Sequence, residues 1–204
     1  SLIIVIGSYI THGFNRTTSA AVVSMIVTII FTGALALYVV DIANLSGFES
    51  DEAIYLNQAT KGVINFQGLL LGGIMIGLLG VLYDVAIGQA VSVEELYNIN
   101  PKASKKHVYK RVLRMGREHI GALINTLAIA YVGVSLPLLL LFSTSTMDPA
   151  VVINKEIFSA EIVRTLVGSI GLVLAVPITT LISVFMVKAN PQHTVNENHH
   201  HHHS

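Results

Sequence analysis

The sequence has no cysteine, and only 12% of its 204 residues are charged. The absence of cysteine excludes disulfides, thiolate metal sites and cysteine nucleophiles. A soluble domain carries roughly 25% charged residues, so the low charge excludes an ordinary soluble protein. Apolar side chains make up 52% of the chain, and its mean hydropathy is +0.67. The composition therefore predicts a membrane protein.

Motifs for enzymatic chemistry are also missing from the sequence. There is no nucleotide-binding loop, no metal-ligand spacing, no pairing of serine with histidine and no pair of catalytic carboxylates. We therefore expect no enzyme, no catalytic residue, no cofactor and no bound metal. The histidine run 199–203 has the form of an expression tag. We divide the chain into one transmembrane helical domain, residues 1–190, and a C-terminal tail with the tag, residues 191–204.

Long apolar stretches predict an all-α fold, a polytopic bundle of transmembrane helices. A helix needs about 20 apolar residues to cross a bilayer, and four stretches reach that length. A fifth stretch is too short, and we expect it to be the truncated end of a helix in a chain that starts inside a longer protein. The four full spans are Ser19–Val40, Phe66–Val91, Ile120–Phe142 and Ile162–Val187, and the short stretch is Leu2–Ile10.

The charge of the connecting segments predicts which side of the membrane each one faces. Lysine and arginine in short connections keep those connections in the cytoplasm. Residues 92–118 contain seven of these cations, whereas residues 41–61 contain one and carry four acids. We therefore expect 92–118 and the C-terminus in the cytoplasm, and the connections 41–61 and 143–161 on the outer side.

The basic connection has its own helical pattern. Val108, Val112 and Met115 recur at helical spacing after the turn signal Asn100-Pro101. This pattern predicts a cytoplasmic amphipathic helix on the inner leaflet, where cations near anionic lipid contribute about 1 kcal/mol each. A basic loop that only sets topology is the alternative. No base-reading motif accompanies the cations, so we expect no nucleic-acid partner.

The second predicted span carries one acid inside its apolar run. Gly73, Gly77, Gly80, Asp84 and Gly88 are separated by steps of four, three, four and four, so they share one stripe of a helix. Small residues let another helix approach closely, and we expect this face to pack against a helix and to turn the carboxylate away from lipid. An aspartate at mid-membrane costs about 2.5–3.5 kcal/mol unless a partner compensates it.

Other polar residues are expected near this acid on the cytoplasmic side. Asp84 lies about 27 Å along its helix from Phe66, and an Asn-Thr pair of the next span reaches a similar depth. The turn "THGFNRTT" lies at the same membrane surface. The predicted cluster consists of Asp84, Asn125, Thr126, His12, Asn15, Arg16 and His119, with Thr17 beside it.

Each member of the cluster has a functional and a structural interpretation. Asp84 carries a proton or cation or contacts substrate, or it takes part in a buried hydrogen bond with Asn125 or Thr126. The Asn-Thr pair otherwise bridges helices, and the histidines at helix ends are otherwise solvated. Further along the chain, Glu161 and Arg164 are three residues apart and predict a local ion pair.

Four long strings of the sequence are distinctive. They are "HGFNRTT" (12–18), "LSGFESDEAIYL" (45–56), "IGLLGVLYDVAIGQAVSVEEL" (76–96) and "GREHIGALINTLAIAYVGVSLPLLLLF" (116–142). Together they closely resemble the YibE/F-like family of bacterial multi-pass membrane proteins. The resemblance implies a bacterial cell membrane as the location, and it implies no particular substrate.

The order of the elements is similar, more faintly, to one transmembrane half of SecD/SecF and related RND transporters. An outward acidic loop precedes a glycine-rich helix with an aspartate, a basic cytoplasmic segment and an Asn-Thr helix. By this likeness Asp84 would relay protons. Those transporters use two halves and large outer domains, so this chain would need a partner.

Two functions stay open from the sequence. The first is a transporter or transporter subunit, ion- or proton-coupled through Asp84. The alternative is a scaffold or accessory subunit of a larger complex, without transport, in which polar residues only lock helices together. In both cases we expect the lipid bilayer as surroundings and either a homo-oligomer or a paired membrane subunit.

Overall fold

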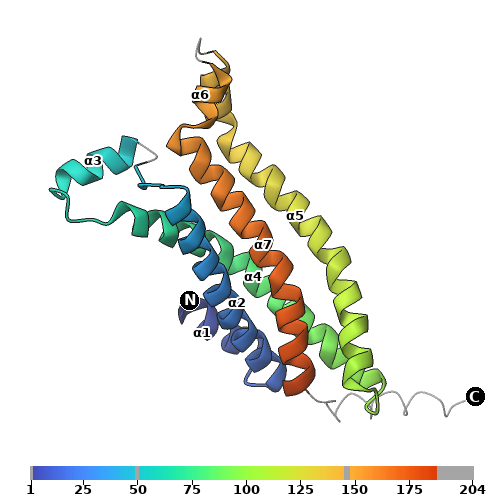
Figure 1. Ribbon diagram of the computed structural model, residues 1–204. Coiled ribbons are helices and arrows are strands. Elements are labelled where there is room, and N and C mark those ends of the chain that lie inside the picture. Colours follow the sequence, from blue (N-terminus) through green and yellow to red (C-terminus); the bar gives the residue numbers. More distant parts are fainter. Residues whose placement is uncertain (1, 49–50, 145–147, 188–204) are drawn as a thin grey trace, which may run out of the picture. The chain divides into compact units, whose positions relative to one another are not determined.

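The structure is a computed structural model that describes residues 2–48, 51–144 and 148–187 (Figure 1). The described residues form helices and no strand, which confirms the predicted all-α class. In chain order the helices are α1 (Leu2–His12), α2 (Arg16–Ile42), α3 (Asp51–Ala59), α4 (Phe66–Ile99), α5 (Lys105–Ser143), α6 (Pro149–Ile153) and α7 (Glu156–Met186).

Four of the helices, α2, α4, α5 and α7, are long and apolar enough to cross a membrane. Their most apolar windows have mean hydropathies between 2.0 and 2.4. They correspond to the four predicted spans, and α1 corresponds to the short N-terminal stretch. These helices indicate a multi-pass membrane protein. The predicted tail and tag, residues 191–204, lie outside the described residues.

The third span begins earlier than the sequence predicted. α5 starts at Lys105 and has 39 residues, so it extends over about 58 Å, compared with about 30 Å for a hydrocarbon core. The predicted amphipathic helix is therefore the first part of α5 and not a separate element. The helix continues because no proline interrupts it before Pro137.

The apolar face of this first part of α5 packs against protein. Val108 and Val112 are fully buried, in one cluster with Val93 and Tyr97 of α4. The expectation that this face lies on the inner leaflet is wrong for these two valines. The reason is that α4 continues beyond its apolar run and offers them a helix to pack against. Met115, the third apolar residue of the pattern, is 51% exposed.

The described residues divide into two compact units, and α2, α4, α5 and α7 each contribute a segment to both. The first unit comprises residues 2–28, 80–120 and 172–187. The second unit comprises residues 29–48, 51–79, 121–144 and 148–171. The members of the predicted polar cluster are therefore divided between two units.

In the first unit, α4 and α5 are antiparallel neighbours joined by the short connection 100–104. Gly116 of α5 lies against the side chain of Gln89 of α4, and Val112 shares a buried cluster with Val93. These contacts fix the register of the pair. Because the two helices run in opposite directions, the residue after Gly116 lies level with the residue before Gln89.

In the second unit, two glycines of α7 make close contacts. A Cβ atom at Gly168 would lie 2.9 Å from the Leu78 side chain of α4, and one at Gly171 would lie 2.8 Å from Thr32 of α2. Real Cβ atoms essentially never approach other atoms this closely. The absence of a side chain at these positions therefore allows α2 and α4 to approach α7.

Candidate functional site

Asp84 lies on an exposed stripe of α4. Its side chain forms no ion pair and no hydrogen bond with any described residue. The buried stripe of the helix carries Ile74, Leu78 and Leu82 instead. The prediction that Asp84 is turned inward among neighbouring helices is therefore wrong for the described residues of a single chain. Large apolar side chains occupy the protein-facing side of α4, which turns the carboxylate outward.

The glycines of the same stripe are exposed as well. A Cβ atom added to any of the four would meet nothing within 4 Å, so no other helix of the described chain packs against them. The predicted close packing of this face is thus absent within the chain. Close glycine contacts occur on α5 and α7, where large side chains of α4 approach, as at Gly116 and Gly168. The exposed glycines are Gly73, Gly77, Gly80 and Gly88.

The turn between α1 and α2 contacts α4 within the first unit. The Nδ1 atom of His12 lies 3.5 Å from the hydroxyl of Tyr83, the residue next to Asp84 in the chain. The buried Thr17 donates a hydrogen bond of 2.8 Å to the Glu94 carboxylate. The turn therefore holds His12 beside the α4 segment that carries Asp84.

Asn15 has a clear structural role in the same turn. Its Oδ1 atom accepts a 2.6 Å hydrogen bond from the backbone N–H of Thr18, and its amide donates to the carbonyl of His12 over 2.9 Å. The first of these bonds is the one that an asparagine makes at the N-terminus of a helix. Arg16, the next residue, is exposed. The geometry thus explains Asn15 as the cap of α2.

The remaining predicted residues lie on the exposed surface of α5. The hydroxyl of Thr126 donates to the carbonyl of Ala122 over 3.0 Å, a bond within the helix. His119 belongs to the first unit, as Asp84 does, whereas Asn125 and Thr126 belong to the second. The approach of the Asn-Thr pair to Asp84 stays a prediction.

A buried polar contact in the first unit was not predicted. The Thr180 hydroxyl of α7 donates to Oε1 of Gln89 over 3.0 Å, and a second acceptor, the carbonyl of Val176, lies 2.7 Å away. Gln89 and Thr180 are both buried. A Cβ atom at Gly116 would lie 2.7 Å from the Gln89 amide, so this glycine makes room for the contact. Each polar residue was visible inside an apolar span, but nothing in the sequence showed that they meet.

A second polar group of the first unit consists of hydroxyls without partners. Thr18 of α2 and Thr179 and Ser183 of α7 have buried side-chain oxygens that bond to no described residue. A buried polar group left unpaired costs about 1–3 kcal/mol. Water that reaches these hydroxyls would recover that cost.

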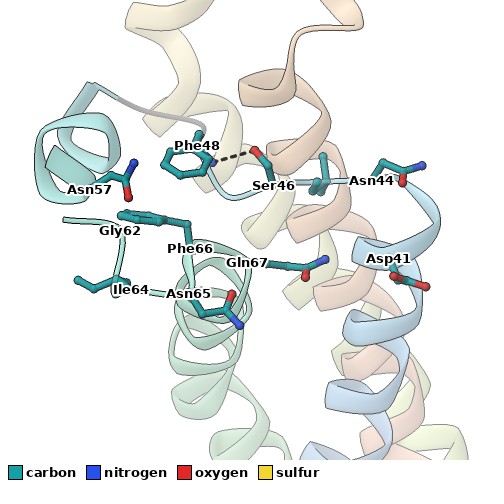
Figure 2. A pocket seen from close by; sticks show the side chains of 11 residues that line it. Asp41, Asn44, Ser46, Phe48, Asn57, Gly62, Ile64, Asn65, Phe66 and Gln67 are labelled. Atoms are coloured by element: carbon teal, nitrogen blue, oxygen red, sulfur yellow. Dashed lines mark hydrogen bonds between the residues drawn. The ribbon is translucent and has the colours of Figure 1, made fainter. Parts of the chain in front are cut away.

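The second unit contains a polar pocket of about 420 Å³ at the ends of α2 and α4 (Figure 2). Phe48 and Phe66 pack together there, with ring centroids 4.5 Å apart. The pocket was not predicted, because most of its lining residues lie in connections that have no periodic pattern. The polar residues that line it are Asp41, Asn44, Ser46, Asn57, Asn65 and Gln67.

The connection beside this pocket is tied to α7. The Glu156 carboxylate accepts hydrogen bonds of 2.6 Å from the Ser46 hydroxyl and from the backbone N–H of Gly47. Gly47 has φ +83, and a Cβ atom there would collide with the backbone of Phe66 and Gln67. Only glycine therefore fits at this point of the connection.

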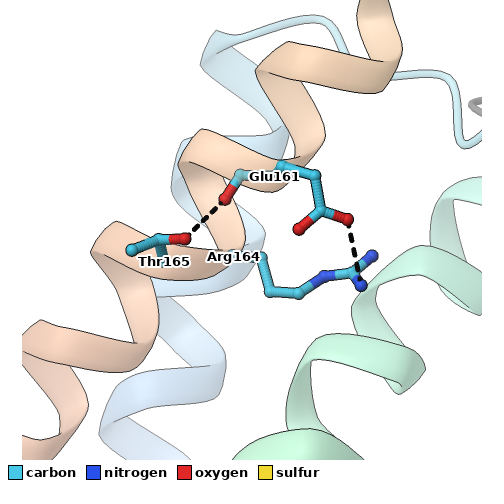
Figure 3. A network of polar contacts seen from close by, with 3 residues as sticks. All are labelled: Glu161, Arg164 and Thr165. Atoms are coloured by element: carbon cyan, nitrogen blue, oxygen red, sulfur yellow. Dashed lines mark hydrogen bonds and ion pairs between the residues drawn. The ribbon is translucent and has the colours of Figure 1, made fainter. Parts of the chain in front are cut away.

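The ion pair predicted between Glu161 and Arg164 is confirmed. The Nη1 atom of Arg164 lies 3.3 Å from the Glu161 carboxylate, and Thr165 donates to the Glu161 carbonyl over 2.9 Å (Figure 3). Both charged side chains are about three-quarters buried in the second unit. This pair is local, three residues apart on one helix, which is why spacing alone could predict it.

The first part of α5 carries a shallow basic groove of about 480 Å³. Its residues share the side of α5 opposite the buried valines, so their charges face away from the rest of the first unit. Among the described residues, no group of three or more histidine, aspartate or glutamate side chains could hold a metal ion. The groove is lined by His107, Lys110, Arg111, Leu113, Arg114 and Arg117.

Comparison with known proteins identifies a family. The family model described as YibE/F-like protein matches residues 1–189, which is nearly the whole chain. Neither the curated proteins nor the solved structures include a match to this chain. The matched range contains all the helices described above and both units. The chain therefore belongs to the YibE/F-like family.

Proposed function

We propose that the chain is a subunit of a transporter in the bacterial cell membrane, and that Asp84 binds and releases the proton or cation that is coupled to transport. The observation that carries the proposal is the exposed carboxylate of Asp84 on the glycine stripe of α4. Ionisable residues inside spanning helices are rare, and most of them serve ion or substrate pathways.

Space around Asp84 supports this role. Gly80 and Gly88 lie one helical turn away on either side, and nothing within 4 Å would meet a Cβ atom at either position. Water or a small cation can therefore approach the carboxylate from the side. Because the carboxylate has no partner among the described residues, its charge must be compensated by water, an ion or another subunit.

The proposed orientation places the C-terminus and the first part of α5 in the cytoplasm. The seven cations between residues 102 and 117 support this assignment through the positive-inside rule. In this orientation Asp84 lies about 15 Å along α4 from Glu94, toward the interior of the membrane.

Proton and cation fluxes through proteoliposomes test the proposal. Vesicles that contain the protein and a trapped pH-sensitive or sodium-sensitive dye receive an imposed potassium diffusion potential. We expect a protein-dependent flux that Asp84→Asn abolishes and that Glu118→Gln, an exposed carboxylate on α5, leaves intact. Equal elution of both variants in gel filtration establishes that they are folded. A flux of wild-type size from a folded Asp84→Asn protein would refute the relay.

A scaffold without transport is the second candidate, and the uncovered glycine stripe favours it. A smooth helix face suits packing against a helix of another subunit, whatever that subunit does. In this case Asp84→Asn would change assembly and leave ion flux at the level of empty vesicles for wild type and variant alike. The two candidates therefore differ in the flux of the wild-type protein.

A further inference from the structure

Two exposed faces in the first unit have matching patterns. The face that we call the acidic face lies on α4 and consists of Asp84, Gly88, Val91 and Glu95, at steps of four, three and four. Its four residues are all exposed. The two carboxylates lie eleven residues apart, which is about 16 Å along the helix.

The basic face lies on α5 and consists of Lys106, Lys110, Leu113 and Arg117, at the same steps. Its three cations are exposed, and Leu113 is half-buried. Lys106 and Arg117 are also eleven residues apart. None of these cations and neither acid of the acidic face forms an ion pair with a described residue.

The two faces can pair only between different copies of the chain. Within one copy, α4 and α5 contact each other through Gln89 and Gly116, and both faces point away from this contact. The internal register places Gly88 level with Arg117, so the basic face overlaps the acidic face in height and is displaced from it by four residues, about 6 Å. Neighbouring copies therefore present opposite charges to each other at heights that differ by about one helical turn.

We infer that the acidic face of one copy binds the basic face of the next. Antiparallel packing of the two helices, with a shift of about one helical turn between the copies, places Asp84 opposite Arg117 and Glu95 opposite Lys106. Between these pairs Gly88 faces Leu113. Because glycine has no side chain, it leaves room on one copy for the leucine side chain of the other.

This interface uses different surfaces on the two copies, so it leaves one free face at each end of a dimer. A contact of this kind adds further copies, and it ends in a ring where the rotation between copies closes. The inference concerns assembly, and it does not depend on whether the protein transports ions.

Disulfide cross-linking tests the interface directly, because the chain has no native cysteine. Two differently tagged copies, one with Gly88→Cys and one with Leu113→Cys, are expressed together and oxidised in membranes. We expect a cross-linked product that carries both tags. The matched control replaces Leu113→Cys by Phe185→Cys, an exposed position on α7, and should give no such product.

Exchanging the charges of Glu95 and Lys106 provides a second test, with the yield of the cross-linked product as the measurement. Glu95→Lys should lower the yield of the mixed product about tenfold, because it places two cations opposite each other. Adding Lys106→Glu to the same chains should restore the yield. Asp84 is unchanged in these variants, so a failure here is distinct from a failure of the ion-flux experiment.

Several outcomes would overturn the inference. Absence of the mixed product would do so, and so would a stronger cross-link between two Gly88→Cys copies, which indicates a symmetric contact of α4 with itself. Cross-linking of Gly88→Cys to a different protein in place of the second copy would also contradict it. An unchanged yield from Glu95→Lys, or no recovery with Lys106→Glu, would refute the charge pairing.

Discussion

The buried hydroxyl of Thr180 donates a hydrogen bond to Oε1 of the buried Gln89 over 3.0 Å, across 91 positions of the chain. Replacing Thr180 by valine keeps the shape of the side chain and removes this donor. We expect Thr180→Val to lower the free energy of unfolding by about 1 kcal/mol, the size of a hydrogen bond between membrane helices. Reversible unfolding in mixtures of mild detergent and SDS measures the change.

Thr126→Val is the matched control for that substitution. The Thr126 hydroxyl is exposed and bonds only within its own helix, to Ala122. Its loss should change the free energy of unfolding little. Equal effects of the two substitutions would show that the hydrogen bond from Thr180 to Gln89 adds nothing to the free energy of unfolding.

Gly116 is expected to be sensitive to the smallest added side chain. A Cβ atom there would lie 2.6 Å from Val176 and 2.7 Å from Gln89. Gly116→Ala should therefore destabilise the folded protein by about 1–3 kcal/mol, as overpacked core substitutions do. Gly72→Ala is the control, because nothing lies within 4 Å of its Cβ position and alanine favours a helix. An equal response of the two variants to SDS would contradict the contact at Gly116.

Gly47 and Gly62 allow the effect of backbone strain to be separated from the effect of a steric clash. Both have positive φ, +83 and +77, and each alanine substitution should cost about 1–2 kcal/mol from backbone strain alone. At Gly47 the added Cβ would also collide with the backbone of Phe66, whereas at Gly62 the nearest atom is 3.9 Å away. We therefore expect Gly47→Ala to be the more destabilising variant. The same SDS titration ranks them, and the reverse order would refute the close approach at Gly47.

Asn15 should stabilise the start of α2 through its side chain. Asn15→Ala removes the acceptor of the Thr18 N–H, and loss of a helix cap costs about 1 kcal/mol. Asn15→Asp keeps the acceptor and should restore most of that stability. Hydrogen exchange at the first amides of α2 measures the effect locally. Unchanged exchange in Asn15→Ala would show that the cap contributes nothing.

The fold class and the spans could be predicted from the sequence because both depend on local composition. The ion pair of Glu161 with Arg164 could be predicted because it depends on local spacing. By contrast, the start of α5 at Lys105 could not be placed from hydropathy. A charged segment can be a loop or the continuation of a helix, and the partner that buries Val108 and Val112 lies elsewhere in the chain.

The glycine stripe of α4 also shows that a local pattern does not identify its packing partner. Its spacing correctly put Gly73, Gly77, Gly80, Asp84 and Gly88 on one face, but spacing cannot tell which face meets the rest of the chain. That choice depends on fit with other helices. Leu78 on the opposite face fits against Gly168 of α7, and Ile74, Leu78 and Leu82 are buried, so α4 turns its large apolar side chains and not its glycines toward the rest of the chain.

The uninterrupted length of α5 has a mechanical consequence. Within the first unit, residues 105–120 form one continuous helical segment that carries cations on one side and the buried Val108 and Val112 on the other. A molecule that binds these cations and rotates the segment would therefore also displace the two valines from Val93 and Tyr97 of α4.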